Sequence, residues 1–439
     1  MMKKTNSPRK RTNLAVIIIS SVLISTFLLT FLQFCFFSEN PFPGPIIQNG
    51  ILSKLQLEGD TNIKTAYHDN SQSSFLPLGE GSVTLHRPQV FTTSAIKGIV
   101  SREEIDINID IPEPHEVIRI GEHAMGGHLP FQRGSFSGIR QNIVLYHVEN
   151  ATFLSEAVFI QDGDYYLFTQ ACHPRYWPMF YKTPPSVTYN YKIYQSAICL
   201  GHQHSSDFGH WFLEVLPAYA IMPEEILKKS VVVVPFKREF VIFGFEFIGV
   251  KEEQIVEGDN IPIFAYHYYT MDYTFCGDLN KYLIAKMRQM FIERFNLAKE
   301  PPTEYVTFNR PNMSRCIGNY KHLRNELREK WPSIKFSDGI YYKSLKDQAV
   351  YFDKIKFLFA VHGSVLANII FMQPNTVVVD LQMEQWLLSF LWLSAYTGKF
   401  MVVGRDPRIS WRGIKPNIID LKYAVSLIEA GLKAGGYIP

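Results

Sequence analysis

A histidine and a carboxylate four residues apart stand near the middle of the chain. Residues 198–222 read ICLGHQHSSDFGHWFLEVLPAYAIM. Ser206 or Asp207 can cap a helix here, and that helix would place His210 and Glu214 on one face. A carboxylate fixes the tautomer of a neighbouring imidazole, so the pair suits general-base catalysis. The alternative is a purely structural pair at a helix start.

Two patterns could instead hold a metal ion. His202, His204 and His210 have roughly the spacing of metal ligands. An Asp-x-Asp motif, Asp162-Gly163-Asp164, can hold a divalent cation against a nucleotide diphosphate. However, Asp-Gly between two alternating apolar runs is a strong hairpin signal. We predict a turn at this motif and no metal site, and a manganese-dependent enzyme using these two aspartates is the alternative.

Two arginines follow a predicted strand at residues 304–308. Arg310 comes two residues after the strand, and Arg315 comes five residues later. Guanidinium groups past the carboxyl end of a strand can hold a diphosphate bidentately. Exposed loop charges are the alternative interpretation.

A glycine turn separates a buried strand from an apolar segment of helical length. The strand is residues 357–361, the turn is His362-Gly363-Ser364, and the segment 365–372 follows. A helix start offers free N–H groups and a positive dipole end to a phosphate. Ligands of open α/β sheets bind at the carboxyl ends of strands, where His362 and Asp380, in the next predicted strand, would lie. An ordinary turn without a ligand is the alternative.

The elements that would position these residues alternate between strands and helices, which predicts an α/β fold. Residues 278–297 form an amphipathic helix, and the Pro-containing stretch 299–302 follows it as a linker. A capping box at residues 344–347 opens another helix, and residues 417–434 close the chain as a helix.

Composition and hydropathy indicate a membrane-anchored globular protein. The 439 residues are 46% hydrophobic and 19% charged. Residues 14–37 carry no charge and are long enough to span a bilayer, so 1–13 would be a cytoplasmic tail. Five of the basic residues lie in that tail, which leaves no basic domain for nucleic acid. Residues 38–85 are rich in Pro, Gly, Ser and Asn and are predicted to form a stem.

A type II topology places the body in the lumen of the secretory pathway. There, Asn150 and Asn312 are predicted N-glycosylation sites, because each begins an Asn-x-Ser/Thr sequon. Four cysteines of the body could form up to two disulfides of unknown connectivity: Cys172, Cys199, Cys276 and Cys316.

Three segments together resemble glycosyltransferase family 61, which includes N-acetylglucosaminyltransferases acting on O-mannose or EGF-like domains and plant xylan glycosyltransferases. Residues 208–217 (FGHWFLEVLP) are similar to the family's His-Trp…Glu/Asp-x-Leu-Pro block. Asn309-Arg310 with Arg315-x-x-x-Asn319 is similar to its Arg…Arg-x-x-x-Asn-Glu block. Gln348 with residues 362–372 (HGSVLANIIFM) is similar to Gln…His-Gly-Ala-Gly-Leu-x-Asn-x-x-Phe-Met. Tyr320 replaces the usual Glu, and Ser364-Val365 replaces Ala-Gly.

The resemblance implies a GT-B architecture, in which two Rossmann-like domains face a cleft. Residues 86–299 would form the acceptor-side domain, and residues 300–439 the nucleotide-sugar-binding domain, with the terminal helix available to cross back to the first. The donor site would comprise seven residues: Arg310, Arg315, His362, Gly363, Ser364, Asn368 and Asp380, the last reaching the ribose. His210 with Glu214 would be the base, and Asp207 the second candidate.

The function that this implies is inverting transfer of a sugar from a UDP-sugar to a glycan or glycoprotein acceptor. N-acetylglucosamine, xylose and arabinose are the expected sugars, in the Golgi or the endoplasmic reticulum. No metal cofactor is required if the arginines and the helix dipole neutralise the diphosphate. The alternative is a catalytically inactive glycan- or protein-binding membrane protein of the same fold, motivated by Tyr320 and Ser364-Val365.

Overall fold

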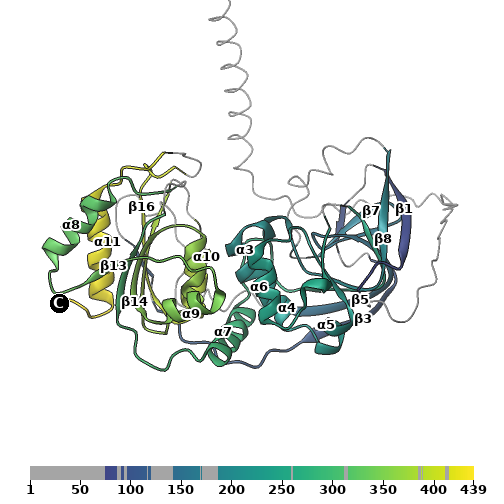
Figure 1. Ribbon diagram of the computed structural model, residues 1–439, viewed down its shortest axis with the longest axis horizontal. Helices are drawn as coiled ribbons and strands as arrows, with labels where there is room; N and C mark the ends of the chain where they lie inside the picture. Colours follow the sequence, from purple (N-terminus) through teal and green to yellow (C-terminus); the bar gives the residue numbers. More distant parts are fainter. Residues whose placement is uncertain are drawn as a thin grey trace, which may run out of the picture. The chain divides into compact units, whose positions relative to one another are not determined.

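The computed structural model describes residues 75–86, 90–92, 96–115, 117–119, 142–168, 170, 186–258, 261–310, 315–383, 387, 389–410 and 415–439. The predicted transmembrane helix, most of the predicted stem and Asn312 lie outside these residues. Among the residues described, no helix is both long enough and apolar enough to cross a bilayer. The described residues build a mixed α/β structure with two sheets (Figure 1).

One of the two sheets, called the second sheet below, has six strands that are all parallel. Its strand order is β13-β12-β14-β15-β16-β4. Along β14, Phe357 and Phe359 face one core, whereas Leu358 and Ala360 face another. The prediction of a strand buried on both faces is therefore confirmed. The strands are β4 (Val117–Arg119), β12 (Glu304–Phe308), β13 (Phe336–Asp338), β14 (Ile355–Val361), β15 (Val377–Gln382) and β16 (Phe400–Arg405).

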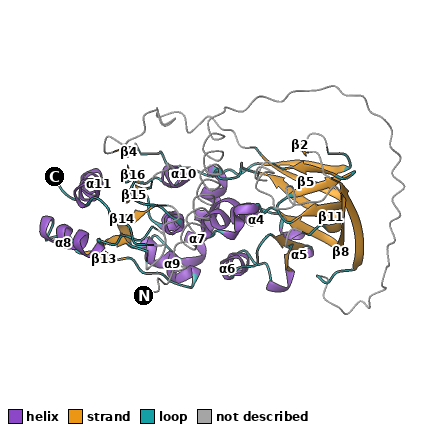
Figure 2. Cartoon of the chain, turned by 90° about the horizontal axis from the view of Figure 1, so that it is seen from above, coloured by secondary structure: helices purple, strands orange, loops and turns teal. Residues whose placement is uncertain are grey.

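Helices cover both faces of this sheet (Figure 2). On one face lie α8 (Tyr320–Lys330) and α11 (Leu421–Ala434). On the other lie α9 (Leu345–Asp353), α10 (Ser389–Tyr396) and the 3₁₀ helix η7 (Ser364–Phe371). The predicted capping box is half formed, because Ser344 Oγ accepts the N–H of Asp347 at 3.3 Å.

The first sheet has ten strands in mixed directions. Its middle, β10-β9-β8-β11, is parallel, whereas β11, β5, β6 and β7 pair antiparallel with one another. The strands are β1 (Gly79–His86), β2 (Val90–Thr92), β3 (Ile99–Ile105), β5 (Ile143–Leu154), β6 (Val158–Gln161), β7 (Asp164–Leu167), β8 (Ser186–Cys199), β9 (Val231–Val234), β10 (Ile255–Glu257) and β11 (Ile263–Asp272).

The antiparallel strands make this sheet differ from the expected Rossmann-like domain. Tight turns join β5 to β6 and β6 to β7, and strands joined by a tight turn must run antiparallel. Asp162 (φ 54°) and Gly163 (φ 82°) both adopt the left-handed region between β6 and β7. Gln161 pairs directly with Asp164 across that turn. The predicted hairpin at the Asp-Gly-Asp motif is therefore confirmed.

One hydrophobic core joins the two sheets. It contains side chains from helices that follow β8 and β9, from α7 (Lys281–Phe295) and from the second sheet. Three of its rings pack together: Phe212 lies 5.5 Å from Phe291 and 5.6 Å from Phe371 between centroids. The helices between β8 and β11 are the 3₁₀ helix η4 (Gln203–Ser206), α3 (Phe208–His210), the π-helical turn η5 (Trp211–Val215), α4 (Leu216–Ala220), α5 (Glu224–Lys229), α6 (Glu239–Phe247) and the 3₁₀ helix η6 (Glu252–Gln254).

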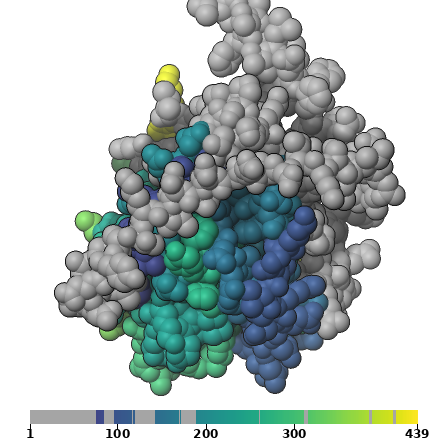
Figure 3. Space-filling model, turned by 90° about the vertical axis from the view of Figure 1, so that its right-hand side faces the viewer, coloured from purple at the N-terminus to yellow at the C-terminus, as the bar shows by residue number. Residues whose placement is uncertain are grey.

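Three segments depart from the predicted division of the chain. The last residues of the predicted stem belong to β1, which pairs antiparallel with β8. β4 lies within the predicted first domain, yet it pairs with β16 at the edge of the second sheet. The terminal helix α11 packs on β14–β16 and α8 of its own sheet rather than on the first. Figure 3 shows the molecule from the side of the first sheet, where blue segments lie beside teal and green ones.

The four cysteines of the body do not form the two disulfides that the sequence would allow. Cys199 and Cys316 are buried and free, and Cys276 is disulfide-bonded. Cys35 and Cys172 lie outside the described residues.

Candidate active site

Glu214 is the anchor of the first half of the site. It lies on the π-helical turn, is 3% exposed, and its Oε1 accepts a 2.6 Å hydrogen bond from His210 Nδ1. Its Oε2 lies 3.0 Å from His202 Nε2 and accepts the N–H of Gly277 at 2.9 Å. Burial by itself would raise the pKa of Glu214, but the hydrogen bonds from His202 and His210 lower it to about 2. The carboxylate is therefore ionised and positions two imidazoles.

His210 presents the reactive edge of this cluster. Its side chain is 34% exposed, and its Nδ1 is occupied by Glu214, which leaves Nε2 to accept a proton. Burial lowers the pKa of His210, but the hydrogen bond and the charge of Glu214 outweigh burial and raise it above its usual value. The predicted pair is thus formed, and His202, which the sequence suggested only as a metal ligand, completes it. His204 stays outside this group of ligand atoms, although its ring centroid is 5.2 Å from that of His210.

Asp207 lies one residue before α3 and is exposed. Its side chain makes no capping hydrogen bond, so the predicted cap is not formed by this residue. Burial and the charge of Arg310 lower the pKa of Arg315 in the other half of the site, and the negative charge of Asp207 partly offsets this lowering. Asp207 therefore borders the same site as His210.

The second half of the site is a pair of arginines over a glycine. A Cβ built on Gly363 would lie 3.3 Å from Arg315 Nη1 and 3.4 Å from Arg310 Nη1. Arg315 Nη1 also donates to the carbonyl of His362 at 3.0 Å. Burial, and then the charge of Arg310, lowers the pKa of Arg315 to about 10. Arg310 Nη1 is buried without a hydrogen-bond partner among the described residues. Two cations held this close favour an anionic ligand.

The two halves meet at the start of η7. A Cβ on Gly209, in the first turn of α3, would lie 3.8 Å from the Cα of Ser364. Ser364 is half-buried and is the first residue of η7, and the carbonyl of the preceding Gly363 accepts the N–H of Leu366 at 2.9 Å. Gly363 is extended (φ 166°), a conformation open to any residue, and a side chain at this position would force the two arginines to shift by a few tenths of an ångström.

His362 and Asp380 lie deeper than the sequence suggested. His362 is 4% exposed, and its Nδ1 lies 2.8 Å from Asp380 Oδ2, which also accepts from Gln382 Nε2 at 2.8 Å. Asp380 is fully buried behind the imidazole. A direct contact between Asp380 and a ribose, as we predicted, is excluded by this burial. The carboxylate orients His362 instead.

Asn368 and Tyr320 have structural partners. Gln348 Nε2 donates to Asn368 Oδ1, and Asn368 Nδ2 donates to the carbonyl of Val365 at 2.9 Å. The Tyr320 hydroxyl donates to Asp338 Oδ1 at 2.7 Å and lies 2.7 Å from Thr307 Oγ1. Tyr320 therefore stabilises the end of β12 and β13 and does not point at the arginines.

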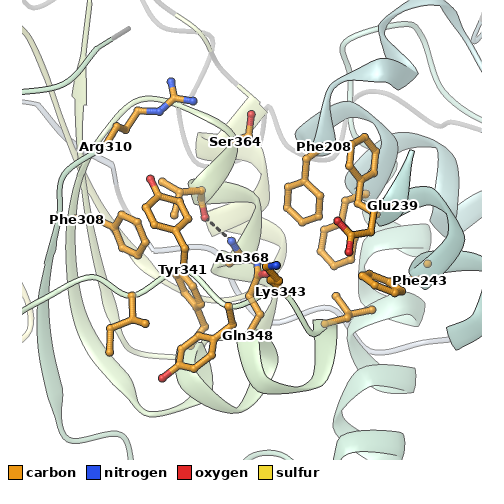
Figure 4. Close-up of a pocket in the computed structure, with 18 residues that line it drawn as sticks. Phe208, Glu239, Phe243, Phe308, Arg310, Tyr341, Lys343, Gln348, Ser364 and Asn368 are labelled. Atoms are coloured by element: carbon orange, nitrogen blue, oxygen red, sulfur yellow. Dashed lines mark hydrogen bonds between the residues drawn. The ribbon is translucent and has the colours of Figure 1, made fainter. Parts of the chain in front are cut away.

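A cavity of about 350 Å³ opens beside the arginines (Figure 4). Phe308 and Tyr341 line it from the second sheet's side, Phe208 and Phe243 from the other, and Arg310 and Ser364 lie at one end. Tyr341 is 53% exposed and packs edge-on against Phe308 at 4.7 Å between centroids. The sequence reading missed these aromatic residues, although the run Ile340-Tyr341-Tyr342 in a loop was a usable signal. Val365 lines this cavity rather than the space over Gly363.

The two predicted sequons have different outcomes. Asn150 is exposed, and it adopts a left-handed conformation (φ 52°) within β5. Asn312 lies outside the described residues. Glycosylation of either remains a prediction.

The fold and the site together define a class. A parallel α/β sheet presents two arginines and a glycine turn near its strand ends, opposite a carboxylate-held imidazole, so one site combines groups that could bind an anion with a group that could accept a proton. Residues 208–379 match the family model Glycosyltransferase 61, which confirms the resemblance to glycosyltransferase family 61 over this segment. The matched segment includes His210, both arginines and the glycine turn. No curated protein matches the chain.

Proposed function

We propose that this protein is an inverting glycosyltransferase of GT-B architecture that uses a UDP-sugar donor. The match of residues 208–379 to the glycosyltransferase family model supports transferase activity in general. The observation that carries the finer proposal is the convergence of Arg310 and Arg315 on Gly363, whose neighbour Ser364 lies against Gly209, the residue before His210. The transferred sugar would be N-acetylglucosamine, xylose or arabinose, and the acceptor a glycan or glycoprotein. Residues 14–37 would anchor the protein in the Golgi or endoplasmic-reticulum membrane, with a lumenal body.

The donor would lie along the second half of the site. The diphosphate would bind both guanidinium groups and the first amides of η7, and the uracil would enter the aromatic cavity. A cavity of about 350 Å³ has the size of a small-ligand pocket. Because two arginines supply the positive charge, this proposal requires no divalent cation.

The reaction would be a single displacement. The acceptor hydroxyl gives its proton to His210 Nε2 while its oxygen bonds to the anomeric carbon of the sugar. The bond between that carbon and the diphosphate oxygen breaks, and UDP leaves with the bonding electron pair. Arg310 and Arg315 would neutralise the charge that develops on the leaving oxygen. Glu214 would keep the Nδ1 proton of His210 in place, so that Nε2 is the basic atom.

The proposal predicts an acid limb in the pH–rate profile. Because Glu214 raises the pKa of His210 above its ordinary value of about 6.5, the imidazole becomes protonated, and so inactive as a base, as pH falls through that raised value. We expect kcat/KM to decrease below it. Glu214→Gln removes the stabilising charge and should move the limb to lower pH. An unchanged limb in this variant, with the fold intact by circular dichroism, would contradict the assignment of His210.

Tyr341 should contribute to UDP binding through its ring. We expect Tyr341→Ala to weaken UDP binding by about 1–3 kcal/mol, the usual contribution of a base stacked on an aromatic side chain. Calorimetric titration would measure the loss, and Tyr341→Phe, which keeps the ring, is the matched control. Pyrophosphate has no base, so its affinity should not change. An equal loss for pyrophosphate would place the uracil elsewhere.

The direct test is release of UDP. Incubation of the protein with each UDP-sugar and no acceptor should release UDP slowly, because water can replace the acceptor. Binding of UDP without any release from UDP-N-acetylglucosamine, UDP-xylose or UDP-arabinose, with or without glycan acceptors, would overturn the enzymatic proposal in favour of a binding protein.

A further inference from the structure

A second cluster of potential metal ligands lies on the first sheet. His147 and Glu149 are two residues apart on β5, and His267 lies on the neighbouring strand β11 (Figure 2). His267 pairs directly with Glu149, and His147 pairs with Tyr269, so all three side chains share one face. One ligand atom from each lies within 4.8 Å of the other two. None of the three lines the cavity beside the arginines.

The distances suit a common ion. His147 Nε2 and His267 Nδ1 are 3.2 Å apart. Two nitrogens bound to zinc at about 2.0–2.1 Å in tetrahedral geometry are themselves about 3.3 Å apart. The two nitrogens lie within hydrogen-bond distance of each other in the absence of an ion, so a small rotation of either ring would let both bind one ion, and Glu149 offers a carboxylate oxygen within 4.8 Å of both.

The sheet holds the ligands in place. The ring of His147 stacks on Tyr269 with centroids 4.6 Å apart and an angle of 14° between the planes. Backbone pairing of β5 with β11 fixes the register on both sides of the cluster. Glu149 is exposed, so an ion can enter from solvent.

We propose that His147, Glu149 and His267 form a zinc site on the β5–β11 face, with its fourth coordination position open to water or to a partner's side chain. Two imidazole nitrogens and one carboxylate oxygen are an ordinary donor set for Zn²⁺. The ion would link β5 to β11 and stabilise the first sheet. This inference does not depend on the proposed transferase activity.

The test is titration of the metal-free full-length protein with zinc chloride. We expect calorimetry to detect a binding event that His147→Gln and His267→Gln each weaken by about 100-fold or more, since loss of outer-shell partners alone costs about 10–100-fold. Cobalt(II) should bind at the same position with the absorption of a four-coordinate ion, and this absorption should disappear in both variants. Zinc should also raise the melting temperature of the wild type but not that of the variants.

Two controls keep the test decisive. His322→Gln removes an exposed histidine of α8 and should leave binding unchanged. His210→Asn disables the other cluster of His202, His210 and Glu214, and should also preserve this event. If His147→Gln and His267→Gln fold poorly, Glu149→Gln, at an exposed position, serves as the test variant. It should lower the affinity for zinc by about tenfold or more. Unchanged affinity in the folded variants, or loss of the event in His210→Asn, would overturn the proposal.

Discussion

Replacing His210 with asparagine should abolish sugar transfer and leave UDP binding intact. The imidazole Nε2 is the acceptor of the substrate proton in the proposed reaction, and asparagine cannot take up that proton. General-base catalysis contributes about 10²–10⁴-fold, so turnover should fall by that factor. Asparagine still reaches Glu214 with its amide N–H, which limits disturbance of the buried carboxylate. Turnover would be followed by UDP release with acceptor present, and UDP affinity by calorimetry.

Asp207 is the alternative candidate for the general base. It is exposed beside the same site and is the second candidate for the base. Asp207→Asn should reduce turnover far less than His210→Asn does. His322→Asn, on the exposed surface of α8, is the matched control for loss of a histidine. A reversed order, in which Asp207→Asn is the inactive variant, would transfer the role of base to the carboxylate.

Arg310→Ala and Arg315→Ala should each weaken UDP binding by about 10–100-fold. A hydrogen bond to a charged group contributes about 1.5–3 kcal/mol, which corresponds to that range. The double variant should lose most measurable affinity for both UDP and pyrophosphate. Arg328→Ala, an exposed arginine of α8, is the control and should bind normally. Because Arg315 also holds the carbonyl of His362, the melting temperature must be measured alongside.

Lysine separates charge from geometry at Arg310. Arg310→Lys keeps the positive charge but loses the planar fork that binds a phosphate bidentately. We expect it to recover part of the affinity lost in Arg310→Ala. If Arg310→Ala, Arg315→Ala and the double variant all bind UDP like the wild type, the nucleotide does not bind over Gly363.

Local patterns predicted the local parts of the site. The spacing of His210 and Glu214 was enough to place both on one helix face, because helical geometry depends only on near neighbours. The third partner, His202, and the N–H of Gly277 come from outside that helix, and no periodicity relates them to Glu214. Asp380 lies toward the strand end where we predicted it, but it is fully buried behind His362 and not open to a ligand. The sequence does not tell which of the two side chains is nearer to solvent.

Long-range pairing limited the prediction of the fold. The parallel sheet was predictable from its apolar runs, such as residues 357–361, which face cores on both sides. The antiparallel additions to the first sheet depend on turns, of which only the Asp-Gly turn was visible in the sequence. β4 is three residues long, which is too short to show an alternation of apolar and polar residues. Its partner strand β16 lies almost three hundred positions away in the sequence.

The position of β4 has a consequence for how the protein can be divided. Residues 300–439, expressed alone, would lack the strand that covers β16. The unpaired N–H and C=O groups of β16 would then form an exposed edge, and its residues Met401 to Gly404 are buried in the intact structure. Such an edge is a template for pairing with another chain. We therefore expect residues 300–439 to aggregate when they are produced without β4, and a fragment that keeps this half soluble has to include residues 117–119.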